Sequence, residues 1–238
     1  HTRLVSDWSS GVCSSDLGSL DGVILTSSKV DSSLPGRLLK QGVPAVLVNR
    51  YVDDVPTDSC VVDSVAGAIL IAEHIVSLGH TEVALLSGSA SSSTGRDRRN
   101  ALIDAFAERG VDILPSRTLS GDFRFSEGQD NLRRLVESDP AITAVVCGND
   151  ILALGALDAA RTLGISIPED LTVIGFDDMP MAAWSMIGLT TVRQDTRGIG
   201  RAGVELLMRR LENPRLPPKQ VAWAPELIVR TSDGPPRA

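Results

Sequence analysis

The sequence predicts an α/β protein whose sheets are mainly parallel. Short apolar runs rich in β-branched residues alternate with longer amphipathic runs along most of the 238 residues. Buried strands separated by helices are typical of parallel sheets with right-handed crossovers. Polar side chains follow several of the apolar runs directly, and ligands of open α/β sheets bind beyond the carboxyl ends of strands. These observations predict both the fold class and the sheet edge at which a ligand would bind.

The first half of the chain alternates regularly. "DGVILTS" and "PAVLVNR" are short and rich in Val, Ile and Leu, whereas the run at 64–80 has apolar residues at helical spacing and stops at Gly79. We expect strands at 21–27, 44–50 and 82–88, an extended segment at 59–64, and helices at 32–42, 64–80 and 93–110.

The second half continues the alternation. "AITAVVCGND" and "LTVIGFDD" are apolar runs that end in polar residues, which favours strands that lead into loops. We expect strands at 141–150 and 171–178, helices at 127–138, 150–164 and 197–213, a crossing segment at 190–195, and two short extended pieces within 219–232.

Residues 1–17 do not fit this pattern. The stretch "HTRLVSDWSSGVCSSDL" has a serine-rich run, an isolated Trp8 and Cys13, and no apolar period, and it lacks the basic and apolar regions of a signal peptide. Its codons can be written to match a common indexed adapter of short-read DNA sequencing, with one base changed at Gly11. We interpret residues 1–17 as a translated adapter, with the biological chain starting at Gly18; the alternative is a natural serine-rich linker.

Composition excludes several classes of partner. The formal net charge is −7 and the arginines are scattered, so the sequence has no basic stripe for nucleic acid. No apolar run reaches the roughly 18 residues of a membrane span. Cys60 and Cys147 lie far apart in apolar runs, which argues against a disulfide framework or a metal site. We expect no cofactor and no contact with a membrane.

Catalytic motifs are not found. The sequence has no GxGxxG after a strand, no phosphate-binding P-loop with its Lys, and no GxSxG nucleophile elbow. His74 and His80 have no carboxylate partner at metal-ligand spacing. The sequence therefore predicts a binding protein rather than an enzyme.

Three polar side chains are candidates for ligand contact. Asp177 follows "VIGF" at a strand end, where its carboxylate can accept hydrogen bonds from hydroxyl groups. Arg98 offers five donors in a planar fork, and Asn149 offers both a donor and an acceptor. Together with an aromatic side chain, this set suits a polyhydroxylated ring; solvated or helix-capping roles are the alternative.

The same residues lie in stretches that resemble a known family. "LDGVILTS", "GRDRRNALIDAF", "GND", "IPEDLTVIGFDD", "LTTVRQ" and "PELIVRTS" are similar to the effector-binding half of the lactose/galactose repressor family. The resemblance covers nearly all of residues 20–232. It implies a bacterial transcription regulator with an N-terminal helix-turn-helix and a periplasmic-binding-protein-like (type I) core, whose two α/β subdomains close on a small effector and which dimerises.

The resemblance also implies site residues. Arg98 matches the effector-binding Arg of the family, Asn149 the Asn of its "ND" motif, and Asp177 the Asp after "IGF". Phe123 falls where the family often has an aromatic or apolar contact with the effector.

Three further positions have competing interpretations. Asp150 is an effector candidate that starts a helix and so could chiefly be its N-cap. Trp184 resembles an aromatic near the mouth of the cleft but could equally be a packing residue. Gln194 is a candidate at the crossing between subdomains.

The family pattern implies two interleaved subdomains. We expect residues 18–87 with 193–218 to form the first and 88–190 with 220–232 the second. The first would be incomplete, because the family's DNA-binding domain and first β-α-β unit have no counterpart in this sequence. The resemblance implies a cytoplasmic, homodimeric regulator that senses a small effector, which we expect to be a sugar, and contacts operator DNA only through the N-terminal domain; the alternative is a periplasmic sugar-binding protein of a transporter.

Overall fold

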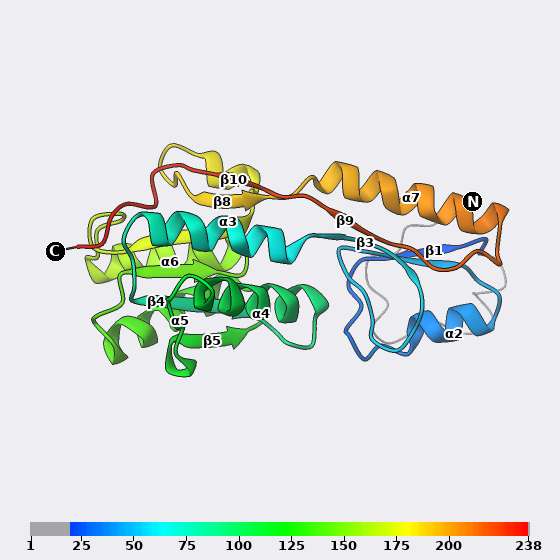
Figure 1. Ribbon diagram of the computed structural model, residues 1–238, viewed down its shortest axis with the longest axis horizontal. Helices are drawn as coiled ribbons and strands as arrows, with labels where there is room; N and C mark the ends of the chain where they lie inside the picture. The colour runs from blue at the N-terminus through cyan, green and yellow to red at the C-terminus, as the bar shows by residue number, and fades with distance from the viewer. Residues whose placement is uncertain (1–19, 238) are drawn as a thin grey trace. The chain divides into compact units, whose positions relative to one another are not determined.

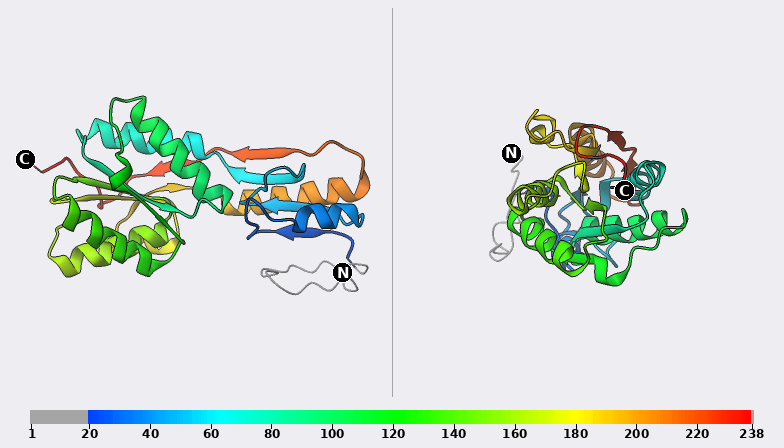
Figure 2. Two further views of the ribbon diagram at one scale, coloured as in Figure 1. Left: turned by 90° about the horizontal axis from the view of Figure 1, so that it is seen from below. Right: turned by 90° about the vertical axis from the view of Figure 1, so that its left-hand side faces the viewer.

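The computed structural model describes residues 20–237, which divide into two compact units (Figures 1 and 2). Unit 1 contains the described residues up to Asp63, the short segment Ser91–Ser93, and Asp195–Trp223. Unit 2 contains Ser64–Ala90, Thr94–Gln194 and the chain from Ala224 onward. Residues 1–17, interpreted above as an adapter, lie outside the described residues. None of the described helices combines the length and apolar character needed to cross a membrane.

Unit 1 is built on a four-stranded parallel sheet with the order β1-β2-β3-β9. Helices α2 and α7 lie on opposite faces of this sheet (Figure 1). Leu38 of α2 belongs to the same buried cluster as Leu25 and Leu47 of the sheet. The elements of unit 1 are β1 (Val23–Leu25), α2 (Leu34–Lys40), β2 (Ala45–Val48), β3 (Asp58–Val62), α7 (Thr196–Glu212) and β9 (Gln220–Trp223).

Unit 2 is built on a six-stranded sheet with the order β10-β8-β7-β6-β4-β5, parallel except for β10. Figure 2 shows α3 and α4 on one face of this sheet and α5 and α6 on the other. Its elements are α3 (Ser64–Ser77), β4 (Val83–Gly88), α4 (Ser93–Ala107), β5 (Thr118–Gly121), α5 (Phe125–Ser138), β6 (Ala144–Cys147), α6 (Asp150–Leu163), β7 (Thr172–Asp177), β8 (Thr190–Arg193) and β10 (Glu226–Ile228), with 3-10 turns at Pro115–Arg117 and Pro180–Ala183.

The boundary between the two parts of the fold differs from the expected one. We expected residues 64–87 in the first subdomain, but β4 pairs with β5 and β6, so α3 and β4 belong to unit 2. We expected residues from 220 onward in the second subdomain, but β9 pairs with β3 in unit 1. Apolar character predicts that a segment is a buried strand but does not indicate which sheet it joins.

The segment after β10 is attached to the sheet of unit 2. Val173 donates its backbone N–H to the Ser232 carbonyl at 2.9 Å, and the Ser232 hydroxyl donates back to the Val173 carbonyl at 2.6 Å. His80 Nε2 lies 2.8 Å from the Gly234 carbonyl oxygen, which can only accept, so this nitrogen carries the proton. Burial lowers the pKa of His80, which favours the neutral ring. The end of the chain therefore behaves as part of the sheet.

Helices α5 and α6 touch through their backbones at two glycines. A Cβ placed on Gly155 would lie 2.1 Å from the Phe125 carbonyl oxygen, and one on Gly128 would lie 2.2 Å from the Leu152 carbonyl oxygen. Real side chains do not approach backbone atoms so closely, so both positions require glycine. This contact fixes the distance between the two helices on that face of the sheet.

Replacing Gly155 with Ala is therefore expected to destabilise the protein by about 1–3 kcal/mol, because the added methyl group must push α5 away from α6. Gly200→Ala in α7 is the matched control, since a Cβ there meets nothing within 4 Å. That change should be neutral or slightly stabilising, because Ala favours helix over Gly by about 0.5–1 kcal/mol. Urea denaturation followed by circular dichroism measures both, and equal effects of the two substitutions would contradict the proposed backbone contact.

Candidate functional site

The candidate site lies where strands of the unit 2 sheet end. Because β4, β6 and β7 run parallel, their carboxyl ends meet at the same edge of the sheet. β4 ends at Gly88, β6 is followed by Asn149, and β7 ends at Asp177. The first turns of α4 extend the same edge, since α4 follows β4 after a short loop. The predicted strand-end residues therefore come from neighbouring strands.

Arg98, on α4, is a buried cation with only 2% of its surface exposed. Its Nη1 donates to the Gly148 carbonyl at 2.8 Å and lies 2.9 Å from Asp177 Oδ1. The guanidinium carbon lies 3.8 Å from the centre of the Phe176 ring, which is favourable cation–π geometry. Among the described residues, its Nε and Nη2 are buried without a hydrogen-bond partner. Two donor atoms of a charged group are thus left for a ligand.

The Asp177 carboxylate accepts hydrogen bonds from two side chains. Its Oδ1 receives Gln194 Nε2 at 2.8 Å as well as Arg98 Nη1. Gln194 is itself buried, and its Oε1 has no partner within the described part of the chain. The backbone of Asp177 has φ 127° and that of Asp178 has φ 52°, both in the region that residues with a side chain avoid. Such strain typically amounts to about 1–3 kcal/mol for each residue and is concentrated at functional sites.

At the start of α6, the N-cap is a different residue from the one that the sequence suggested. The N-cap is Asn149, whose Oδ1 accepts the Leu152 backbone N–H at 2.9 Å, so the interpretation of Asp150 as the cap is wrong. Asp150 is fully buried, and its oxygens accept from the Met179 N–H at 2.7 Å and the Thr191 hydroxyl at 2.5 Å. Burial raises the pKa of Asp150 to about 6, against the effect of these two hydrogen bonds. Asp150 therefore supports the site from within the protein.

The two aromatic candidates lie in different places. Phe123 lies over the end of β4, with its ring where a Cβ of Gly88 would be. Gly148 is a neighbour of that strand end, since its N–H donates to the Leu86 carbonyl, so Phe123 is close to the strand that leads to Asn149. Trp184, by contrast, is 53% exposed and lines an apolar groove along α6, away from the contacts of Arg98 and Asp177.

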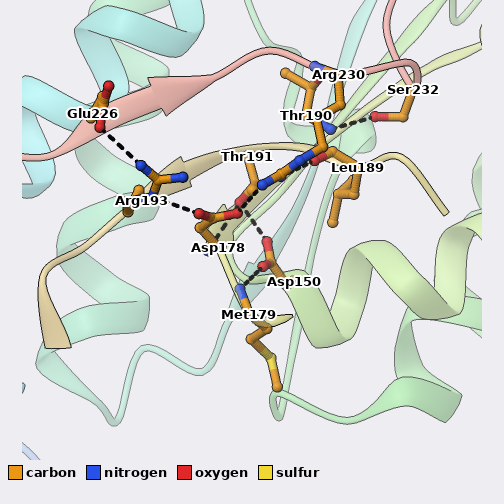
Figure 3. A network of polar contacts seen from close by, with 10 residues as sticks. All are labelled: Asp150, Asp178, Met179, Leu189, Thr190, Thr191, Arg193, Glu226, Arg230 and Ser232. Carbon is orange, nitrogen blue, oxygen red and sulfur yellow. Dashed lines mark hydrogen bonds and ion pairs between the residues drawn. The ribbon is translucent and has the colours of Figure 1, made fainter. Parts of the chain in front are cut away.

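Asp178 is a residue whose importance the sequence did not indicate. Its carboxylate accepts from Arg193 Nε at 2.7 Å and from Arg230 Nη2 at 2.6 Å (Figure 3). Burial would raise the pKa of Asp178, but the hydrogen bonds from both arginines outweigh this and keep the pKa below its ordinary value. In the sequence Asp178 is only the second acid of a pair, and neither arginine partner is adjacent to it.

In the described part of the chain, no three potential metal ligands gather to form a metal site.

Comparison with known proteins identifies the family. Residues 72–232 match the model of a periplasmic binding protein-like domain. A regulatory protein of the LacI family from Chloroflexus aggregans has a structure with a TM-score of 0.82 and 32% identity, over 91% of this chain and 78% of that chain. A LacI family transcriptional regulator from Mycobacterium smegmatis has a TM-score of 0.85 and 29% identity, over 93% of this chain and 81% of that one.

Curated relatives are longer than this chain. The HTH-type transcriptional repressor PurR of Aliivibrio salmonicida is 28% identical over 214 residues, which are 90% of this chain and 64% of the relative. The HTH-type transcriptional regulator DegA of Bacillus subtilis is 31% identical over 91% of this chain and 65% of the relative. The chain thus spans about two thirds of the length of these regulators. The chain belongs to the lactose/galactose repressor (LacI) family of transcriptional regulators and contains its periplasmic-binding-protein-like, ligand-binding domain.

Proposed function

We propose that this chain is the effector-sensing part of a DNA-binding regulator and that Arg98, Asp177 and Asn149 bind the effector. The buried Arg98, with Nε and Nη2 lacking a partner among the described residues, carries this proposal. A buried donor without an acceptor is unfavourable by about 1–3 kcal/mol, and a ligand that accepts from it removes this penalty. Phe123 would contact an apolar face of the effector, and Gln194 would offer its Oε1 as an acceptor.

The effector we propose is a neutral sugar or a similar polyol. Arg98 is already paired with Asp177, so the pair brings little net positive charge to attract a phosphate. The pair instead presents donors on one side and an acceptor on the other, as vicinal hydroxyl groups require. Solved structures of similar regulators include a complex with cellobiose and one with bound ribose.

The regulator as a whole would be cytoplasmic and would bind operator DNA through a part outside these 238 residues. Effector binding would change operator affinity by a coupling free energy of about 1–3 kcal/mol, which is typical of allosteric proteins. The relatives named above are transcriptional regulators, which favours this role over that of a transport protein.

The protein would act as a homodimer that uses the apolar groove along α6. Met186 is 79% exposed beside Trp184, and both line this groove together with Phe125, Leu154 and Met181. A contiguous exposed apolar surface of this kind typically marks an interface between proteins. We propose a second copy of the chain as its occupant.

Calorimetric titration of the purified chain is expected to show binding of a neutral sugar. Ribose and cellobiose are the first probes, with guanine and a ribose phosphate as the chemical alternatives. The neutral Arg98–Asp177 pair should favour the sugars over the phosphate. Tight binding of the nucleobase without any sugar binding would contradict the polyol proposal.

Replacing Arg98 with Met is expected to weaken sugar binding by about 10- to 100-fold, because hydrogen bonds to a charged group contribute about 1.5–3 kcal/mol. Arg99→Met is the matched control on the same helix, since among the described residues the Arg99 guanidinium donates hydrogen bonds to the neighbouring Asn100 alone, at 3.3 Å. Its dissociation constant should stay within about twofold of the original value. Equal loss of affinity in both variants, each checked for folding by circular dichroism, would refute a specific role of Arg98.

Met186→Asp is expected to shift the protein from dimer to monomer in sedimentation velocity, because a carboxylate cannot be buried unpaired in an apolar interface. Met208→Asp in α7 provides the comparison, since Met208 is also an exposed methionine, at 52%, and lies outside the groove. A dimer that survived Met186→Asp but dissociated with Met208→Asp would place the interface elsewhere.

A further inference from the structure

We propose that Asp178 and Asp150 are positioning residues for the effector site, because they hold Asp177 in the backbone conformation that places its carboxylate against Arg98 and Gln194. This inference rests on the proposed function, in which Asp177 and Arg98 contact the effector. Neither Asp178 nor Asp150 needs to touch the effector itself.

The starting observation is that two consecutive residues with side chains have positive φ. Asp177 is at 127° and Asp178 at 52°, directly at the end of β7. The value at Asp177 is especially unfavourable for an L-residue, and such a conformation persists only where its surroundings impose it. Asp177 bonds to Arg98 and Gln194 through its side chain. On one side its backbone is held by the pairing of Asp177 with Arg193 in the sheet, and on the other side the residues immediately after it can fix its direction.

The first anchor is the side chain of Asp178. One oxygen accepts from Arg193 on β8, and the other accepts from Arg230, which follows β10. Arg230 also donates to the Leu189 carbonyl at 2.7 Å, so its guanidinium is held on two sides. Figure 3 shows the Asp178 carboxylate lying between the two arginines. Charge-assisted bonds of this kind are short and directional, so they fix where the Asp178 Cα can lie.

The second anchor is the carboxylate of Asp150, which holds the backbone of Met179. Oδ2 of Asp150 accepts the Met179 N–H, and Oδ1 accepts the Thr191 hydroxyl on β8 (Figure 3). A Cβ on Gly175 would lie 2.3 Å from Asp150 Oδ1, so β7 has a glycine where this carboxylate passes. The backbone at residues 178 and 179 is thus held by the carboxylate of Asp178 itself and by the carboxylate of Asp150 at the start of α6.

The pKa values of the two anchoring residues, Asp178 and Asp150, are shifted in opposite directions. The pKa of Asp178 is held below its ordinary value, so Asp178 stays ionised at physiological pH. Burial, together with the charges of Asp177 and Asp178, raises the pKa of Asp150 to about 6, although the hydrogen bonds from Thr191 and Met179 act in the opposite direction. Among the described residues, the Thr191 hydroxyl on β8 and the Cys147 thiol on β6 also face Asp150, while Arg193 and Arg230 bond to Asp178. Asp150 is therefore ionised above pH 6 and takes up a proton below it, where it accepts hydrogen bonds more weakly.

The expected consequence is a loss of effector affinity when either anchor is weakened. Asp178→Asn keeps the size of the side chain but removes its charge, and should raise the dissociation constant for ribose or cellobiose by about 10-fold or more. Glu226→Gln is the control, because Glu226 contacts the same Arg193, at 3.2 Å, from an exposed position. Glu226→Gln should leave the dissociation constant within about twofold of the original.

The dependence of sugar affinity on pH distinguishes a positioning role of Asp150 from an effect of Asp150 on the stability of the fold. In the original protein, affinity for the sugar should fall as the pH is lowered through about 6, as Asp150 takes up its proton. Asp150→Asn should have low affinity throughout and no step near pH 6. A step of unchanged size in Asp150→Asn would overturn the role of Asp150.

Crystal structures of the Asp178→Asn and Glu226→Gln variants provide a measurement that needs no ligand. In Asp178→Asn, Asp177 should leave its positive φ and its Oδ1 should move beyond 4 Å from Arg98 Nη1, whereas Glu226→Gln should keep both. An unmoved Asp177 in Asp178→Asn would overturn the proposal. If Asp177 moves as expected but the original protein binds no sugar, the anchoring stands and the proposed ligand class fails.

Discussion

The ion pair between Arg98 and Asp177 is the contact on which the candidate site depends. It joins α4 to the end of β7, and the same guanidinium nitrogen also bonds to the carbonyl of Gly148 after β6. Removing one member of such a buried pair is generally much more harmful than replacing both, because the other charge stays buried alone. The Arg98 guanidinium therefore links α4 to the ends of β6 and β7. A substitution of Arg98 affects all three elements.

The parallel sheet explains why these residues could be found in the sequence. Asp177 and Asn149 follow apolar runs directly, and strand ends in a parallel sheet converge on one edge, so their neighbourhood could be predicted. Arg98 was recognised because it matches a family motif; helical periodicity alone would not have distinguished it from Arg96 or Arg99. The order of the other strands and helices was also predictable from the length and composition of each apolar run, but β5 (Thr118–Gly121) was missed because its sequence TLSG has only one large apolar residue.

Contacts between distant segments could not be predicted in the same way. Asp178 and Arg230 are 52 residues apart, and nothing local to either indicates the other. The choice between Asn149 and Asp150 as the cap of α6 depends on which side chain turns back to the helix, and both residue types are good caps. The assignment of β4 and β9 to their sheets likewise depends on pairing partners far along the chain.

The interleaving of the two units has a consequence for synthesis of the protein. The sheet of unit 1 is completed by β9 and that of unit 2 by β10 and the segment after it, which the ribosome makes last. Domains usually fold as units during translation, the N-terminal one first. Here neither sheet has all its strands until β9 and β10 have been synthesised, so β3 and β8 are edge strands of the nascent chain until then. A chaperone that shields unpaired strands on the ribosome would serve such a topology more than one in which each domain is a continuous stretch of sequence.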